Sequence, residues 1–133
     1  MRVFLALVVV LVAACDTDGI DPSPFSEGLI VEIEDETVLR LTTDGAPGCA
    51  TPMVIESEVW SDELAVDVLG LALSPGCLAL IPSTWTRTLP AFEDSLVLTI
   101  RHNSETDRYV IRDTPSGRQL EGIRSSVTRL GAG

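Results

Sequence analysis

Short apolar runs separated by turn residues recur about every ten positions along most of the chain, and this pattern predicts β-strands. Residues 28–35 (GLIVEIED) and 36–45 (ETVLRLTTDG) are expected to pair with each other across a turn. In residues 51–60 (TPMVIESEVW) apolar and acidic side chains alternate, which is typical of a half-buried strand.

The second half of the chain continues the same alternation. Residues 64–73 (LAVDVLGLAL) place their valines on one face, and in residues 95–102 (SLVLTIRH) Leu96, Leu98 and Ile100 alternate with Val97, Thr99 and Arg101. The turn after residue 102 is expected to return the chain into residues 108–113 (RYVIRD) as a hairpin. The tail is rich in turn residues and carries one predicted strand, at residues 126–130.

No window keeps a helical period over ten or more residues, so the sequence predicts little helix. Seven or eight short strands in one domain favour an all-β fold, a small antiparallel β-sandwich of immunoglobulin-like type. A small β-barrel is the alternative. Fold class alone implies no activity.

The first fifteen residues follow a different pattern. Arg2 supplies a positive charge, residues 3–14 are all apolar, and two alanines precede Cys15. This is the order of an export signal, and the apolar run is shorter than the roughly 20 residues that a membrane-spanning helix needs. Export followed by cleavage before Cys15 is therefore expected.

The four residues Val12 to Cys15 resemble the lipobox of bacterial lipoproteins. That resemblance covers the signal only, and it implies a diacylated and N-acylated Cys15 as a lasting membrane anchor. The expected organisation is a signal peptide at residues 1–14, a lipidated cysteine with a flexible tether at residues 15–26, and one β-sandwich domain at residues 27–133. The resemblance implies the bacterial cell envelope and leaves open the inner or the outer membrane.

Charge excludes one class of partner. The chain has nine basic residues, all of them arginine, against 20 acidic ones, and loss of Arg2 with the signal leaves a net charge of −12. Binding to nucleic acid requires a basic footprint, so nucleic acid is not expected as a partner. Residues 16–84 carry fourteen acids and one arginine, whereas residues 85–133 carry six acids and seven arginines.

Cys49 and Cys77 remain once Cys15 is lipidated. In an exported chain, two remaining cysteines are expected to form one disulfide. A zinc site is not expected, because the chain has no CxxC pair and a single histidine. No cofactor is expected.

Catalysis is not expected either. His102 is the only histidine that could serve as a general base, and it stands at a turn, where an exposed or capping role is the simpler interpretation. No GxSxG elbow and no phosphate-binding glycine pattern accompanies it. We therefore expect a protein that is not an enzyme, with a small tethered hydrolase as the disfavoured alternative.

The acidic residues suggest a weaker hypothesis. Glu32 and Glu34 recur at period two, which places them on one strand face that water can solvate. A weak calcium patch at these two residues is the alternative to a simply solvated face. An acidic loop at residues 16–27 fits a calcium-loop pattern poorly, because its glycine is displaced.

Four large side chains are candidates for an interaction surface. Arg101, Arg108 and Arg112 share the outward parity of the predicted hairpin and oppose the acidic strands in sign. Trp60 shares parity with the glutamates of its strand, so it is expected to be partly exposed, whereas Trp85 is expected in the core. Complementary patches within the sandwich or between molecules are one hypothesis, and stacking of Trp60 on a glycan or a peptide is another.

Together these features predict an envelope lipoprotein whose domain is a non-catalytic binding or structural module at a membrane surface. The expected partners are the membrane that holds the lipid anchor and a protein or glycan of the envelope. The alternatives are an accessory subunit of a larger envelope complex and a weak calcium-binding or glycan-binding module.

Overall fold

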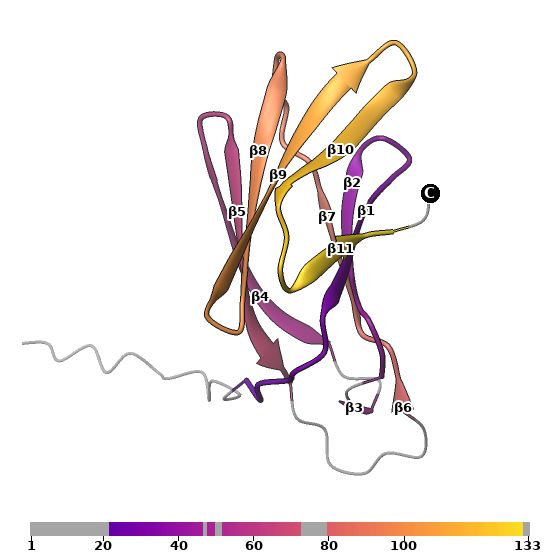
Figure 1. Ribbon diagram of the computed structural model, residues 1–133, viewed down its shortest axis with the longest axis vertical. Helices are drawn as coiled ribbons and strands as arrows, with labels where there is room; N and C mark the ends of the chain where they lie inside the picture. Colours follow the sequence, from indigo (N-terminus) through magenta and orange to yellow (C-terminus); the bar gives the residue numbers. More distant parts are fainter. Residues whose placement is uncertain (1–21, 47, 50–51, 73–79, 132–133) are drawn as a thin grey trace, which may run out of the picture.

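The computed structural model describes residues 22–46, 48–49, 52–72 and 80–131, and these residues form strands and turns with no helix (Figure 1). Nine strands form two sheets that face each other, which confirms the all-β sandwich. Among the described residues neither sheet closes on itself, so the barrel alternative is not the fold.

The smaller sheet contains four strands, in the order β11 (Thr128–Leu130), β1 (Leu29–Glu34), β2 (Val38–Thr43) and β7 (Thr84–Thr88). The larger sheet contains five strands, in the order β10 (Gly117–Arg124), β9 (Glu105–Thr114), β8 (Ser95–His102), β5 (Glu63–Leu71) and β4 (Met53–Trp60). Two short strands, β3 (Gly48–Cys49) and β6 (Leu80–Ile81), pair separately.

The core lies between the two sheets and is built by the inward half of each strand. Side chains at every second position are fully or almost fully buried, as the period-two pattern predicts. The main contributors are Leu29, Val31, Leu39, Leu41, Leu64, Val66, Leu96, Leu98, Ile100, Tyr109 and Ile111.

Two strand pairs correct the expectation of purely antiparallel sheets. β5 runs parallel to β8, and β1 runs parallel to β11. Between β5 and β8 the chain passes through β7 in the other sheet, so it re-enters the larger sheet in the direction in which β5 ran. The two sheets hold nine strands against the seven or eight expected, and β10 was not foreseen.

The hairpin of β8 and β9 confirms the prediction made for residues 95–113. Its connection is a two-residue turn, Asn103–Ser104, and both residues have positive φ angles (51° and 64°). A turn with two positive φ angles matches the twist of the flanking strands, and asparagine tolerates this conformation well. The last predicted strand is also present, as β11.

Two residues of the expected tether lie on the folded domain. The backbone of Ser23 exchanges two hydrogen bonds of 2.8 Å with Leu71, the last residue of β5. Phe25 is buried in the core, and its ring lies 4.6 Å from the ring of His102 at the end of β8. The N-terminal segment is therefore fixed at one end of the sandwich, which we call the N-terminal pole (Figure 1).

Candidate functional site

The outer face of the five-stranded sheet carries acidic, basic and hydroxyl side chains together with one exposed tryptophan. It is formed by the strand positions that alternate with the core residues, so it points away from the four-stranded sheet. Strand register places these positions in rows that cross the sheet. One row is Glu56, Asp67, Arg101 and Thr106; the next is Glu58, Ala65, Thr99, Arg108 and Arg124; a third is Trp60, Glu63, Val97, Val110 and Glu121.

Charge is divided across this face. Four of the five acids lie on β4 and β5 and three of the four arginines lie on β9 and β10, while Arg101 stands on the central strand β8 and Glu121 on β10. Counting the outer positions, five acids (Glu56, Glu58, Glu63, Asp67 and Glu121) stand against four arginines (Arg101, Arg108, Arg112 and Arg124). The face is thus almost neutral overall, whereas the whole chain carries a net charge of −11.

A hollow of about 460 Å³ lies in the acidic half. Trp60 stands at its border with 64% of its surface exposed, which is unusual for the largest of the side chains. The carboxylates of Glu56, Glu58 and Glu63 share the lining with Arg101. An exposed aromatic ring beside several charges can stack on a flat ligand and also orient it by hydrogen bonds.

Some charges on the face already have partners within the molecule. Arg101 lies 3.6 Å from Asp67, and Arg112 lies 3.5 Å from Glu121. The hydroxyl of Thr99, which is 5% exposed, donates a 2.9 Å hydrogen bond to Glu63. These contacts fix side chains in the middle of the face.

Arg108 and Arg124 differ from the other two arginines of the face. They lie side by side in register on β9 and β10, and both are exposed. Within the described part of the chain no carboxylate lies within 4.0 Å of either guanidinium. No basic group of the described residues lies within 4.0 Å of the carboxylate of Glu56 or of Glu58. Opposite charges at the two sides of one face are therefore available to a partner.

The structure brings all four residues of the predicted interaction surface onto this one face. Trp60 is exposed, and Arg101, Arg108 and Arg112 point outward as their parity predicted. Sequence reasoning missed Arg124, because β10 was not predicted. Trp85 packs against the core while remaining partly exposed.

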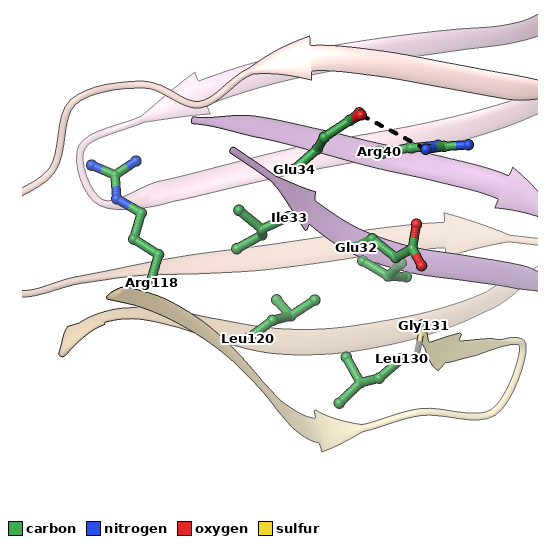
Figure 2. Close-up of a pocket in the computed structure, with 9 residues that line it drawn as sticks. Glu32, Ile33, Glu34, Arg40, Arg118, Leu120, Leu130 and Gly131 are labelled. Carbon is green, nitrogen blue, oxygen red and sulfur yellow. Dashed lines mark ion pairs between the residues drawn. The ribbon is translucent and has the colours of Figure 1, made fainter. Parts of the chain in front are cut away.

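A second pocket, of about 390 Å³, opens between the edges of the two sheets (Figure 2). Figure 2 shows the apolar side chains of Ile33, Leu120 and Leu130 gathered between β1 and the C-terminal strands. Glu32, Glu34, Arg40 and Arg118 also line it. An apolar floor with a few charged groups is the usual composition of a small-ligand pocket.

The proposed cation patch lies at this second pocket. Glu34 lies 3.9 Å from the guanidinium of Arg40, and Arg40 is directly opposite Glu32 in register. An arginine between two carboxylates supplies the positive charge that a cation would otherwise bring. Across the described ranges, no group of three or more histidine, cysteine or acidic residues is arranged to hold a metal ion.

His102 is buried, at 3% exposure, so of the two roles expected for it the exposed one is wrong. Its Nε2 lies 2.9 Å from the carbonyl oxygen of Glu27, a distance at which an N–H donates to that oxygen. The neighbouring Asn103 side chain donates to the carbonyl oxygen of Phe25 at 2.8 Å. These two side chains hold the N-terminal segment.

Asp107 is a buried acid that the sequence analysis did not single out. Its carboxylate accepts five hydrogen bonds, from the backbone N–H of Ser126, Val127 and Thr128 and from the hydroxyls of Ser126 and Thr128. Burial raises the pKa of Asp107, but these hydrogen bonds outweigh burial and hold the pKa below its ordinary value. Parity could have identified it, since it shares the inward face with Tyr109 and Ile111.

The lipidation site Cys15 and one of the paired cysteines, Cys77, lie outside the described residues, and Cys49 lies in β3. The anchor and the disulfide therefore stay predictions. Within the described ranges there is no helix able to serve as a membrane span.

Comparison with known proteins gives no further guide to function. No protein-family model matches the chain, and no curated protein or solved structure matches it.

Proposed function

We propose that the protein is a non-catalytic interaction module of the bacterial cell envelope, held at a membrane by acyl chains on Cys15. In this proposal the module binds a protein partner through the outer face of its five-stranded sheet. The observation that carries the proposal is the face itself, with exposed Trp60, a hollow beside it and opposite charges that have no ion-pair partner among the described residues.

The anchor in this proposal is short. Cys15 is separated from the fixed residue Ser23 by seven residues, and the eight residue steps between them span at most about 28 Å. The N-terminal pole would therefore stay near the membrane surface, and the outer face of the sheet would be presented sideways to it. A partner in or near the same membrane could then reach this face.

The anchor is tested by mass spectrometry of the mature protein purified from its native membrane. We expect an N-terminal fragment that starts at Cys15 and carries three acyl chains. An unmodified residue 15 would contradict the anchor.

The binding face is tested by photo-crosslinking in cells, with the crosslinking residue placed at Glu58 on the proposed face. The matched control places it at Thr86 on β7, which is exposed on the four-stranded sheet. We expect a discrete adduct from position 58 that is lost when Trp60→Ala is added, and no such adduct from position 86. Equal crosslinking from both positions, or none from position 58, would contradict the proposal.

A glycan is the second candidate ligand, because the exposed ring of Trp60 borders a hollow lined by hydrogen-bonding groups. Titration of soluble peptidoglycan fragments should then quench Trp60 fluorescence in a Trp85→Phe variant. Unchanged emission at millimolar fragment would reject this candidate and leave the protein partner.

A further inference from the structure

We propose that the partner of the outer face is a second copy of this chain, related by a twofold axis that runs along β8. The inference rests on the proposed function, because it uses the same face and the same membrane anchor. Two independent features support it: the distribution of charge across the face and the position of the N-terminal pole.

The charge distribution is self-complementary about only one kind of axis. β8 is the central strand, with acidic β4 and β5 on one side and arginine-bearing β9 and β10 on the other. Rotation of a second copy about an axis parallel to β8 places its β9 and β10 over β4 and β5 of the first copy. The acidic half of each copy then faces the arginine half of the other, as an isologous interface requires.

The same rotation keeps each row of side chains at its own height along the strands. Glu58 and Arg124 occupy the two ends of one row, so Glu58 of each copy lies opposite Arg124 of the other. Arg108 is the neighbour of Arg124 in that row and strengthens the positive side. These are the charges that have no ion-pair partner within the described part of the chain.

A twofold axis perpendicular to the strands gives the opposite result. It places β4 of one copy over β4 of the other, so that Glu56 and Glu58 of the first copy face Glu56 and Glu58 of the second. It also makes Arg108 and Arg124 of the first copy face Arg108 and Arg124 of the second. Like charges that face each other cost several kcal/mol, so this arrangement is disfavoured.

The N-terminal pole selects the same axis independently. Ser23 is bonded to the last residue of β5, and Phe25 and Glu27 contact the last residue of β8. Rotation about an axis parallel to β8 leaves both N-terminal poles at the same end of the dimer. Both acyl anchors can then enter one bilayer, whereas the perpendicular axis would direct them to opposite ends.

The size of the face indicates a weak dimer. The five strands lie about 4.8 Å apart, and the three rows of side chains span about six residues of each strand at about 3.3 Å per residue. The face therefore measures roughly 20 by 20 Å. That area is smaller than the roughly 800 Å² per partner of a standard interface. Confinement to a membrane raises the effective concentration of such a pair, so the anchor and the interface support each other.

Net charge sets the salt range in which the dimer forms. The two copies carry −12 each, and their centres would lie about 20 Å apart, two sheet spacings. Screening over about 10 Å at 0.1 M salt weakens this long-range repulsion while pairs in contact persist, whereas 1 M salt also screens exposed pairs. We expect association to be strongest near 0.1–0.2 M salt and weaker at about 0.01 M and at 1 M.

A charge-swap experiment tests the inference on the mature chain with Cys15→Ala. The first variant carries Arg108→Glu and Arg124→Glu, and the second carries Glu56→Arg and Glu58→Arg. Sedimentation velocity at concentrations up to several hundred micromolar measures each alone and the two mixed. The control carries Glu32→Arg and Glu34→Arg on the other sheet, which gives the second variant's change in net charge away from the face.

We expect the parent and the control to dimerise and each charge-swap variant to associate at least about tenfold more weakly. The mixture of the two variants should form a heterodimer, because the first variant is acidic on both halves of the face and the second is basic on both, so every facing pair again joins opposite charges. Recovery in the mixture also shows that both variants are folded. A parent that stays monomeric at every salt concentration, or a mixture that fails to associate, would overturn the inference.

Failure of the dimer is distinguishable from failure of the proposed function. A monomeric parent whose position 58 still forms a Trp60-dependent adduct in cells would retain the binding face and assign it to a different protein. If the parent is monomeric and position 58 also forms no Trp60-dependent adduct, both the dimer and the proposed binding face are wrong.

Discussion

The backbone N–H and the hydroxyl of Thr128 both donate to one carboxylate oxygen of Asp107, at 2.7 and 2.6 Å. This pair joins β9 in one sheet to β11 in the other, and the hydroxyl of Tyr109 also contacts Thr128. The buried carboxylate therefore fixes the crossing of the chain from β10 to β11. That crossing in turn creates the parallel pair of β1 and β11.

We expect Asp107→Asn to lower the free energy of unfolding by about 2–4 kcal/mol, because the amide nitrogen would face N–H groups that need an acceptor. Urea unfolding at neutral pH measures this change. Glu105→Gln, at an exposed position of the same strand, is the matched control and should shift the value by less than about 0.5 kcal/mol. Equal effects of the two substitutions would contradict the assigned role.

Protonation of the Asp107 carboxylate in acid should lower the free energy of unfolding. Its pKa is lower in the folded chain than in the unfolded chain, since the hydrogen bonds outweigh burial. The stabilisation is therefore complete above the unfolded pKa, near 3.9, and is lost as the pH falls through the folded pKa. Urea midpoints should fall more steeply below about pH 4 in the parent than in Asp107→Asn. Parallel curves for the two proteins would contradict this.

Gly70 should be required for docking of the N-terminal segment. Its φ angle is +145°, and a Cβ there would lie 2.5 Å from the carbonyl oxygen of Ser23. We expect Gly70→Ala to cost about 1–3 kcal/mol and to speed hydrogen exchange at the Ser23 and Leu71 amides. Gly122→Ala is the control, since its Cβ would make an ordinary 3.5 Å contact with Tyr109. Unchanged exchange in Gly70→Ala would show that the segment does not depend on this contact.

The two tryptophans should differ in their contribution to stability. Trp60 is largely exposed, so Trp60→Ala should change the unfolding free energy by less than about 0.5 kcal/mol. Trp85 packs against the core, so Trp85→Ala should cost about 2 kcal/mol. Thermal melts of both variants measure this difference, and a large loss in Trp60→Ala would mean that the ring serves the fold instead of a partner.

Local alternation predicted the strands whose two faces differ. The hairpin of β8 and β9 was predicted because Leu96, Leu98 and Ile100 alternate with less apolar residues. β10 lies at a sheet edge with mostly exposed side chains, even at Ile123, so its sequence carries no clear apolar period. The parallel pairing of β5 with β8 depends on the path through the other sheet, which no local pattern contains.

The candidate site could also be predicted only in part from local sequence patterns. Outward parity was enough to place Arg101, Arg108 and Trp60 on sheet faces, because a period of two has only two outcomes. Register decides which strands lie side by side, and only the structure brings Glu58 and Arg124 into one row. Burial of Phe25 in the core was hidden by the prolines and acids around it.

We propose above that two copies, each held by its lipid anchor, meet through their outer faces with both N-terminal poles toward one bilayer. A dipolar distance measurement on the lipidated chain in vesicles, with a spin label at Ser104→Cys, tests it most directly. Ser104 lies in the turn beside the N-terminal pole, so we expect an intermolecular distance of about 10–20 Å. A distance of about 30 Å or more, or no intermolecular coupling at all, would contradict the claim.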